Sequence, residues 1–100
     1  MDAASHFAPS YAQARQMFLA AADAAGLDVE SHPHPMLGRD GEALAMDVVR
    51  EGARDAKALL IVSSACHGIE GFCGSGVQHA LLSDAAWHQL LRERQVAVLY

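Results

Sequence analysis

The residues best suited to chemistry lie in one short glycine-rich segment, residues 63–76, which reads SSACHGIEGFCGSG. His67 and Glu70 stand three positions apart within it. In a tight turn, or in the first turn of a helix, that spacing can direct both side chains toward one point. An imidazole nitrogen and a carboxylate oxygen both bind zinc, at roughly 2.0–2.2 Å. We therefore take His67 and Glu70 as candidate ligands of a Zn²⁺ ion.

A simpler interpretation of this pair stays open. A histidine and a glutamate can also occupy a polar helix N-terminus, where the helix dipole favours a carboxylate. The bare H-x-x-E pattern is weak, because it occurs often by chance. Its context favours a metal, since the pair follows an apolar run and Gly68 and Gly71 let the backbone bend sharply around it.

The elements around this segment are expected to form an α/β layer arrangement. Residues 58–63 (ALLIVS) are an unbroken apolar run, which predicts a buried central strand. Ligands of open α/β sheets bind just past the carboxyl ends of the strands, which is where the candidate pair stands. A helix to about residue 83, further helix over 84–94 and a buried strand over 96–100 complete a crossover between parallel strands.

The first part of the chain predicts a lead-in and a helix. Residues 1–9 are expected to be a flexible lead-in. Ser10 and Gln13 then form a capping-box pattern, in which each side chain can satisfy a free backbone amide of the first turn. Apolar residues follow at spacings of three and four, and Gly26 is placed to end the helix in the left-handed conformation.

Two strands are expected next. Residues 27–34 and 43–50 read as antiparallel strands around a turn at 38–41. Pro33 and Pro35 favour an edge position for the first strand. The whole pattern predicts an α/β fold, a partial three-layer α/β/α sandwich with a mixed sheet.

Composition and charge limit the classes of function. The chain has 100 residues, 52% hydrophobic and 19% charged, which is typical of one globular domain. The net charge is -5 and the seven Lys and Arg residues are scattered, which argues against a nucleic-acid partner. No apolar run is long enough for a transmembrane helix, and the N-terminus does not resemble a signal peptide. We expect a cytoplasmic protein without a membrane partner.

Other histidines are weaker metal candidates. His32 and His34 flank a proline, and residues two apart in a strand share a face, so both could contact a metal. Exposure near a turn is the more ordinary outcome for such a pair. His79 lies further along, on the helix that follows the glycine-rich segment, and is expected to point away from His67.

Cys66 and Cys73 flank the H-x-x-E pair. Two cysteines are few for a disulfide scaffold, so both are expected to be reduced thiols. With His67 they would offer a mixed zinc site or a thiol-based redox or metal-sensing module. Their spacing is unusual for a metal site, and small buried residues are the preferred interpretation.

The remaining motifs favour structural interpretations. Gly71, Gly74 and Gly76 faintly suggest a phosphate loop, but the lysine of a Walker loop is missing. These glycines are better explained by a helix start that approaches the preceding turn closely. Arg39 is expected to be exposed in its turn, and Trp87 is expected in the core.

The glycine-rich segment resembles a known family. Residues 64–76 (SACHGIEGFCGSG) are similar to the pattern S-G-T-H-G-V-E-G-F-C-G-S-A of DUF2817-type proteins, a carboxypeptidase-like branch of the zinc carboxypeptidase superfamily. Residues 35–47 (PMLGRDGEALAMD) also resemble that family's turn and second strand, and the resemblance runs from about residue 7 to residue 100. Ala65 and Cys66 stand where glycine and threonine are usual.

The resemblance implies a zinc-dependent amide-bond hydrolase, in which zinc-activated water attacks the carbonyl of a peptide or an N-acyl amino acid. It implies that His67 and Glu70 are two of the metal ligands. The third ligand, the general base and the substrate-binding arginines of the superfamily have no matching position here. We therefore expect residues 10–100 to be the N-terminal portion of such a domain, ending within a strand and inactive alone.

The alternative is a non-catalytic unit. A truncated remnant could act only as a structural or interaction unit, for example by pairing an open sheet edge with another chain. The sequence does not choose between these functions, and it does not give the oligomeric state.

Overall fold

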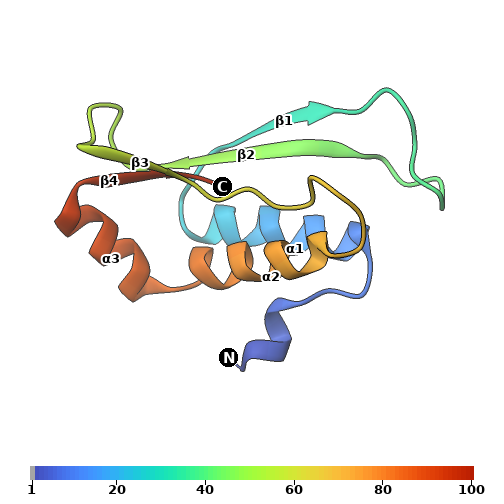
Figure 1. Ribbon diagram of the computed structural model, residues 1–100, viewed down its shortest axis with the longest axis horizontal. Helices are drawn as coiled ribbons and strands as arrows, with labels where there is room; N and C mark the ends of the chain where they lie inside the picture. Colours follow the sequence, from blue (N-terminus) through green and yellow to red (C-terminus); the bar gives the residue numbers. More distant parts are fainter. Residues whose placement is uncertain (1) are drawn as a thin grey trace.

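Figure 1 shows a mixed sheet with the helices packed against one of its faces, in a computed structural model that describes residues 2–100. Met1, part of the expected lead-in, lies outside the described residues. The elements in chain order are a 3₁₀ turn η1 (Ala3–His6), α1 (Tyr11–Ala24), β1 (Val29–Pro33), β2 (Ala45–Glu51), β3 (Ala58–Ile61), α2 (Gly71–Leu82), α3 (Ala85–Arg94) and β4 (Val96–Leu99). The sheet order is β1-β2-β4-β3. The predicted α/β fold with a mixed sheet is confirmed.

The predicted positions of both ends of α1 are confirmed, but only the Ser10 half of the capping box forms, because the Gln13 side chain accepts from the Ser10 hydroxyl. The Ser10 hydroxyl accepts a hydrogen bond from the Gln13 amide at 3.2 Å, which satisfies a free amide of the first turn. At the other end Gly26 has a φ of +73°, and its amide donates to the Asp23 carbonyl at 2.9 Å. Between the two ends, α1 buries Phe18 and two alanines against the sheet.

The helix α1 is fastened to the β1–β2 hairpin, which is antiparallel with β1 at the sheet edge, as predicted. The Arg15 guanidinium donates to both carboxylate oxygens of Asp47 on β2, at 2.8 and 3.1 Å. The hydrogen bonds from Arg15 hold the pKa of Asp47 below its usual value. The Tyr11 hydroxyl adds a second attachment, because it accepts from the Ala45 amide at 2.9 Å.

The crossover is confirmed, since β3 and β4 are parallel and α2 and α3 join them. The prediction that residues 58–63 form a buried central strand was wrong. In the described residues β4 is the inner strand, and β3 lies at the edge with all four residues exposed. An unbroken apolar run is buried only where neighbours cover the strand, and within residues 2–100 only β4 pairs with β3.

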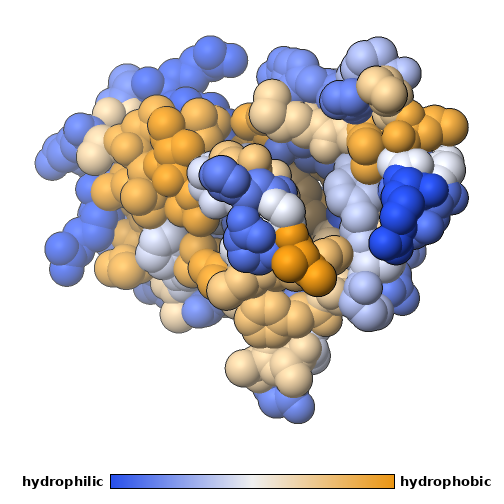
Figure 2. Space-filling model, turned by 45° about the vertical axis from the view of Figure 1, so that its right-hand side comes forward, coloured by the Kyte–Doolittle hydropathy of each residue, from blue (hydrophilic) through white to orange (hydrophobic). Residues whose placement is uncertain are grey.

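Large hydrophobic residues are therefore not confined to the interior of the protein. Figure 2 shows a broad apolar area on the left of its view. The exposed large apolar residues include three consecutive ones of β3, Leu59, Leu60 and Ile61, which are 50%, 42% and 65% exposed. In contrast, β4 is largely buried, as predicted for residues 96–100.

The core lies between the sheet and the helix layer, and every α-helix contributes to it. Its buried members are Phe18, Ala21, Ala22, Val49, Leu82, Leu91, Val98 and Tyr100. Trp87 packs against this cluster, as predicted. None of the helices within residues 2–100 combines the length and the apolar character needed to cross a membrane.

Candidate metal centre

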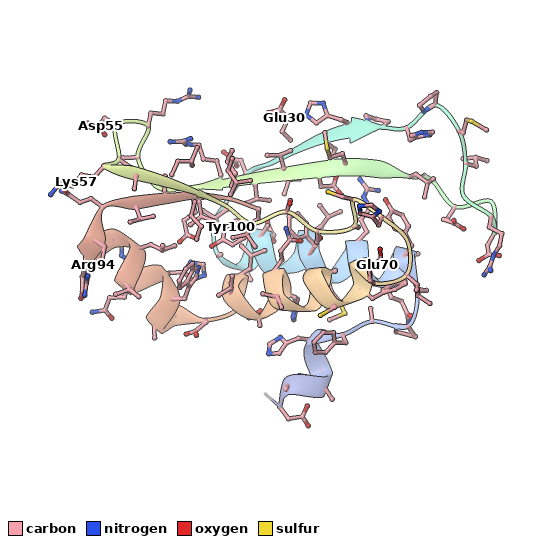
Figure 3. All side chains as sticks on the ribbon, in the orientation of Figure 1. Glu30, Asp55, Lys57, Glu70, Arg94 and Tyr100 are labelled. Carbon is pink, nitrogen blue, oxygen red and sulfur yellow. The ribbon has the colours of Figure 1, made fainter. Side chains whose placement is uncertain are left out.

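The candidate ligands lie on the segment that joins β3 to α2, past the carboxyl end of β3. Both His67 and Glu70 are exposed. Glu70 immediately precedes α2, and its side chain makes no capping hydrogen bond to that helix. Figure 3 shows Glu70 at the N-terminal end of α2. The Glu70 carboxylate is thus not committed to the helix end beside it, which leaves it available to a ligand.

The backbone around the pair forms a short turn that leads directly into α2. The amides of residues 71–73 donate to the carbonyls of residues 68–70, at 2.9, 3.2 and 3.0 Å. These bonds include Glu70, and His67 lies immediately before the first of them. Because these three amides are already bonded, they are not offered to a phosphate, unlike the amides of a phosphate-binding loop.

Close contact between this turn and α2 explains the glycines. A Cβ atom placed on Gly71 would lie 2.7 Å from the Ala65 Cα atom, and one placed on Gly74 would lie 2.8 Å from the Ser64 Cβ atom. Any larger residue would push the helix away from the segment that carries the pair. The interpretation as close-approach positions to the preceding segment is confirmed for Gly71 and Gly74, whereas Gly76 approaches the Phe7 side chain instead.

The backbone at Ala65 has an unusual conformation. Its φ is +61°, in the left-handed region that favours glycine, and the side chain is exposed. This is the position at which the resemblance gives glycine as the usual residue. The alanine is therefore accommodated at a conformational cost, two residues before His67.

A buried glutamine, which the sequence analysis missed, holds the segment to α2. Gln78 is 5% exposed, and its amide nitrogen donates to the Val62 carbonyl at 2.6 Å. Its amide oxygen accepts from the Ser64 hydroxyl at 2.8 Å. The signal in the sequence is a polar side chain on the inner face of an otherwise apolar helix, at a position that pattern analysis alone assigns to the core.

The pair fits part of a zinc site. Imidazole nitrogen and carboxylate oxygen are donors that zinc takes, and a Cβ atom on Gly68 would lie 3.7 Å from Glu70 Oε2, so no bulky group fills the turn. Within residues 2–100, no group of three or more His, Cys, Asp or Glu side chains could hold a metal ion. Catalytic zinc takes three protein ligands, so the described residues can offer no more than two of them.

The other histidines are engaged elsewhere. His32 Nε2 lies 3.2 Å from a carboxylate oxygen of Glu30, and His34 Nδ1 accepts from the backbone amide two residues further on. His79 Nδ1 lies 2.8 Å from His6 Nδ1 on η1. Burial, and then the neighbouring His6, lower the pKa of His79. None of these three histidines joins a metal-binding group of the described residues.

The cysteines are free thiols, as predicted, but the interpretation of both as buried residues was wrong. Cys66 lies in the exposed turn, and Cys73 lies on an exposed face of α2. Small size did not bring them into the core, because that turn and that face have no covering layer. Arg39 is exposed, as predicted, and its guanidinium lies 3.3 Å from the carboxylate of Asp40.

A family model matches residues 7–100, and its description is "Protein of unknown function (DUF2817)". The matched range includes α1, all four strands and the turn that carries His67 and Glu70. No curated protein and no solved structure matches the chain.

Proposed function

The chain belongs to the DUF2817 family, and on that premise we propose that His67 and Glu70 are two metal ligands of a zinc-dependent, carboxypeptidase-like amide-bond hydrolase. One observation carries the proposal. The two side chains are exposed on the short segment between β3 and α2, past the carboxyl end of a parallel strand, and Glu70 is not used as a helix cap. Ligand sites of α/β folds lie at that end of the strands.

The residues around His67 and Glu70 restrict the positions that the two side chains can take. Gln78 fixes the start of the segment to α2, and Gly71 lets the helix approach it closely. Both restrict the turn, so that His67 and Glu70 are held before a metal arrives, which lowers the entropy lost on binding. Zinc, when bound, lowers the pKa of a coordinated water toward about 7 and polarises the scissile carbonyl.

The substrate class that we propose is a peptide or an N-acyl amino acid. In either case the bond broken is an amide, and a carboxylate other than Glu70 has to take the water's proton and pass it to the leaving amine. The described residues do not assign that carboxylate, and they do not distinguish the two substrates.

The test is the zinc content and the amide-hydrolase activity of a His67→Ala, Glu70→Ala double variant of the protein. Loss of two ligands should remove the bound zinc and the activity together. The matched control is His32→Ala with Glu30→Ala, which deletes another exposed His–Glu pair, with side chains 50% and 75% exposed. This control should keep both properties. A His67, Glu70 double variant that retains its zinc and its activity would refute the assignment.

A second candidate function rests on β3. Its outer edge has no strand partner within residues 2–100, and the strand contains neither a charged residue nor a proline. Exposed edges of this kind pair readily with other chains unless charges or prolines protect them. We propose, as the alternative to the hydrolase, a non-catalytic unit that pairs β3 with a second copy of the chain.

Sedimentation distinguishes this alternative. Edge pairing predicts a dimer that Ile61→Lys dissociates, because a lysine on an edge strand opposes pairing. The matched control is Ile69→Lys in the segment that carries His67 and Glu70, residues 65–70, called the metal turn from here on. Ile69 is equally apolar and even more exposed, at 82%, and its replacement should leave the dimer intact. A monodisperse monomer at high protein concentration would exclude edge pairing.

A further inference from the structure

A largely buried histidine–glutamate pair, His88 with Glu51, lies apart in the sequence from the turn that carries His67 and Glu70. The ring of His88 on α3 is held between two acceptors. Its Nδ1 atom lies 2.5 Å from Glu51 Oε2, and its Nε2 atom lies 2.8 Å from the Leu82 carbonyl oxygen. A neutral imidazole carries only one N–H. With an ionised Glu51 as one partner, both hydrogen bonds can therefore form only when His88 is the imidazolium, which donates from each nitrogen.

The neighbouring side chains fix the remaining protons. The Tyr100 hydroxyl donates to Glu51 Oε1 at 2.6 Å and accepts from Trp87 Nε1 at 2.9 Å. Because Trp87 can only donate, the hydroxyl proton of Tyr100 has to go to Glu51. Both carboxylate oxygens of Glu51 then act as acceptors, as an ionised carboxylate does. The arrangement with an ionised Glu51 and a protonated His88 satisfies all four side chains.

The position of Leu82 adds a further role. It is the last residue of α2, so its carbonyl is one of those that the helix leaves without a partner. A cation is favourable at this negative end of the helix dipole. His88 thus caps α2 from the next helix, and its bond to Glu51 ties both helices to the end of β2. Figure 3 shows Tyr100 between the sheet and the helix layer.

We propose that the Glu51–His88 pair is a pH-sensitive latch, which holds the junction of α2 and α3 against β2 and opens when His88 loses its proton. Deprotonation leaves one N–H for two acceptors. Either the α2 carbonyl or the Glu51 carboxylate then loses its partner in a site that water reaches poorly, since the side chains of His88 and Glu51 are only 14% and 11% exposed.

The groups that face His88 determine its pKa. Burial alone lowers its pKa, but the hydrogen bond to Leu82 and the bond and charge of Glu51 outweigh burial. Arg92 on the same helix acts in the lowering direction, and Tyr100 faces Glu51 rather than the ring. The resulting pKa of His88 is raised above the ordinary histidine value of 6.5.

The sign of the pH effect follows from this direction. A raised pKa in the folded state means that the folded protein binds the His88 proton more tightly than the unfolded chain does. The stabilisation is fully present below pH 6.5, the ordinary value, and is lost as the pH rises through the raised value. The latch therefore opens on the alkaline side.

The test is a titration of the histidine ring nitrogens of the wild-type chain by NMR, with hydrogen exchange of the backbone amides around residues 82–88. At about pH 6, near the unperturbed value, both ring nitrogens of His88 should carry protons. On raising the pH, His79 should lose its proton first and His88 later, because burial lowers the pKa of His79. Exchange at the junction should then rise faster than the ordinary base-catalysed increase.

A neutral variant provides the second measurement. His88→Gln carries no titrating proton, so its stability should not show the alkaline loss of the wild type. The matched control is His79→Gln, which should retain that loss. The latch is overturned if one ring nitrogen of His88 is unprotonated at about pH 6, or if His88→Gln and the wild type lose stability identically. The NMR result decides the question even if His88→Gln does not fold.

Discussion

Two of the histidine–glutamate pairs of this chain stand in opposite surroundings. In the metal turn His67 and Glu70 are exposed, and Glu70 is not bonded to the helix that follows it. In the latch His88 and Glu51 are largely buried, and each of their polar atoms has a partner. Residue type alone does not separate a binding site from a structural network. The two are separated by the number of hydrogen-bond donors and acceptors that are left unused.

The strongest way to break this comparison is to remove the glutamate from each region. Glu51→Ala leaves the His88 cation and the Tyr100 hydroxyl buried without their acceptor, so the free energy of unfolding should fall by about 3–5 kcal/mol. Glu70→Ala removes an exposed side chain and should change it by less than about 0.5 kcal/mol. Urea unfolding at about pH 6, where His88 is charged, measures both.

A milder substitution of Glu51 shows how much of the lost stability comes from its charge. Glu51→Gln keeps an amide oxygen that can accept from His88 or Tyr100 but removes the charge, so its stability should lie between those of the wild type and Glu51→Ala. If Glu51→Ala and Glu70→Ala were equally mild, the buried pair would contribute no more than an exposed one, and the contrast between the two regions would fail.

A second substitution tests how firmly the metal turn is supported. Gln78→Leu retains the size of the side chain but leaves the Val62 carbonyl without the amide donor and the Ser64 hydroxyl without its acceptor. The free energy of unfolding should fall by about 1–3 kcal/mol, the cost of unpaired buried polar groups. Ser64→Ala is the control, because it removes one of the two bonds and should cost less. A Gln78→Leu chain of unchanged stability would show that the turn does not depend on this side chain.

The local elements were predictable because their signals lie within a few residues. The cap at Ser10, the left-handed Gly26 and the crossover between parallel strands each follow from short-range chemistry or from periodicity. The position of β3 was not predictable in this way. An apolar run shows that a strand can be buried on both faces, but it does not say which strands lie beside it.

The hydrogen-bond network of Glu51 and His88, like that of Gln78, could not be predicted from the sequence for a related reason. Glu51, His88 and Tyr100 are far apart in the chain, and each has an ordinary local context. Only the tertiary arrangement of β2, α3 and β4 brings them together. The metal turn is the opposite case, since its two candidate ligands are close in sequence and could be proposed from one short segment, although no described residue completes their set.

The smallest predicted effect concerns strain in the metal turn. Ala65 is exposed and has a φ of +61°, which costs an L-residue roughly 1–2 kcal/mol. Ala65→Gly removes that strain but increases the freedom of the unfolded chain, so the free energy of unfolding should rise by about 0.5–1 kcal/mol. Ala43→Gly is the control at an exposed loop position without a positive φ, and it should lower that free energy by a few tenths of a kcal/mol. If the two substitutions change the free energy of unfolding in opposite directions, the exposed turn holds strain. If both lower it, the turn is as relaxed as an ordinary loop.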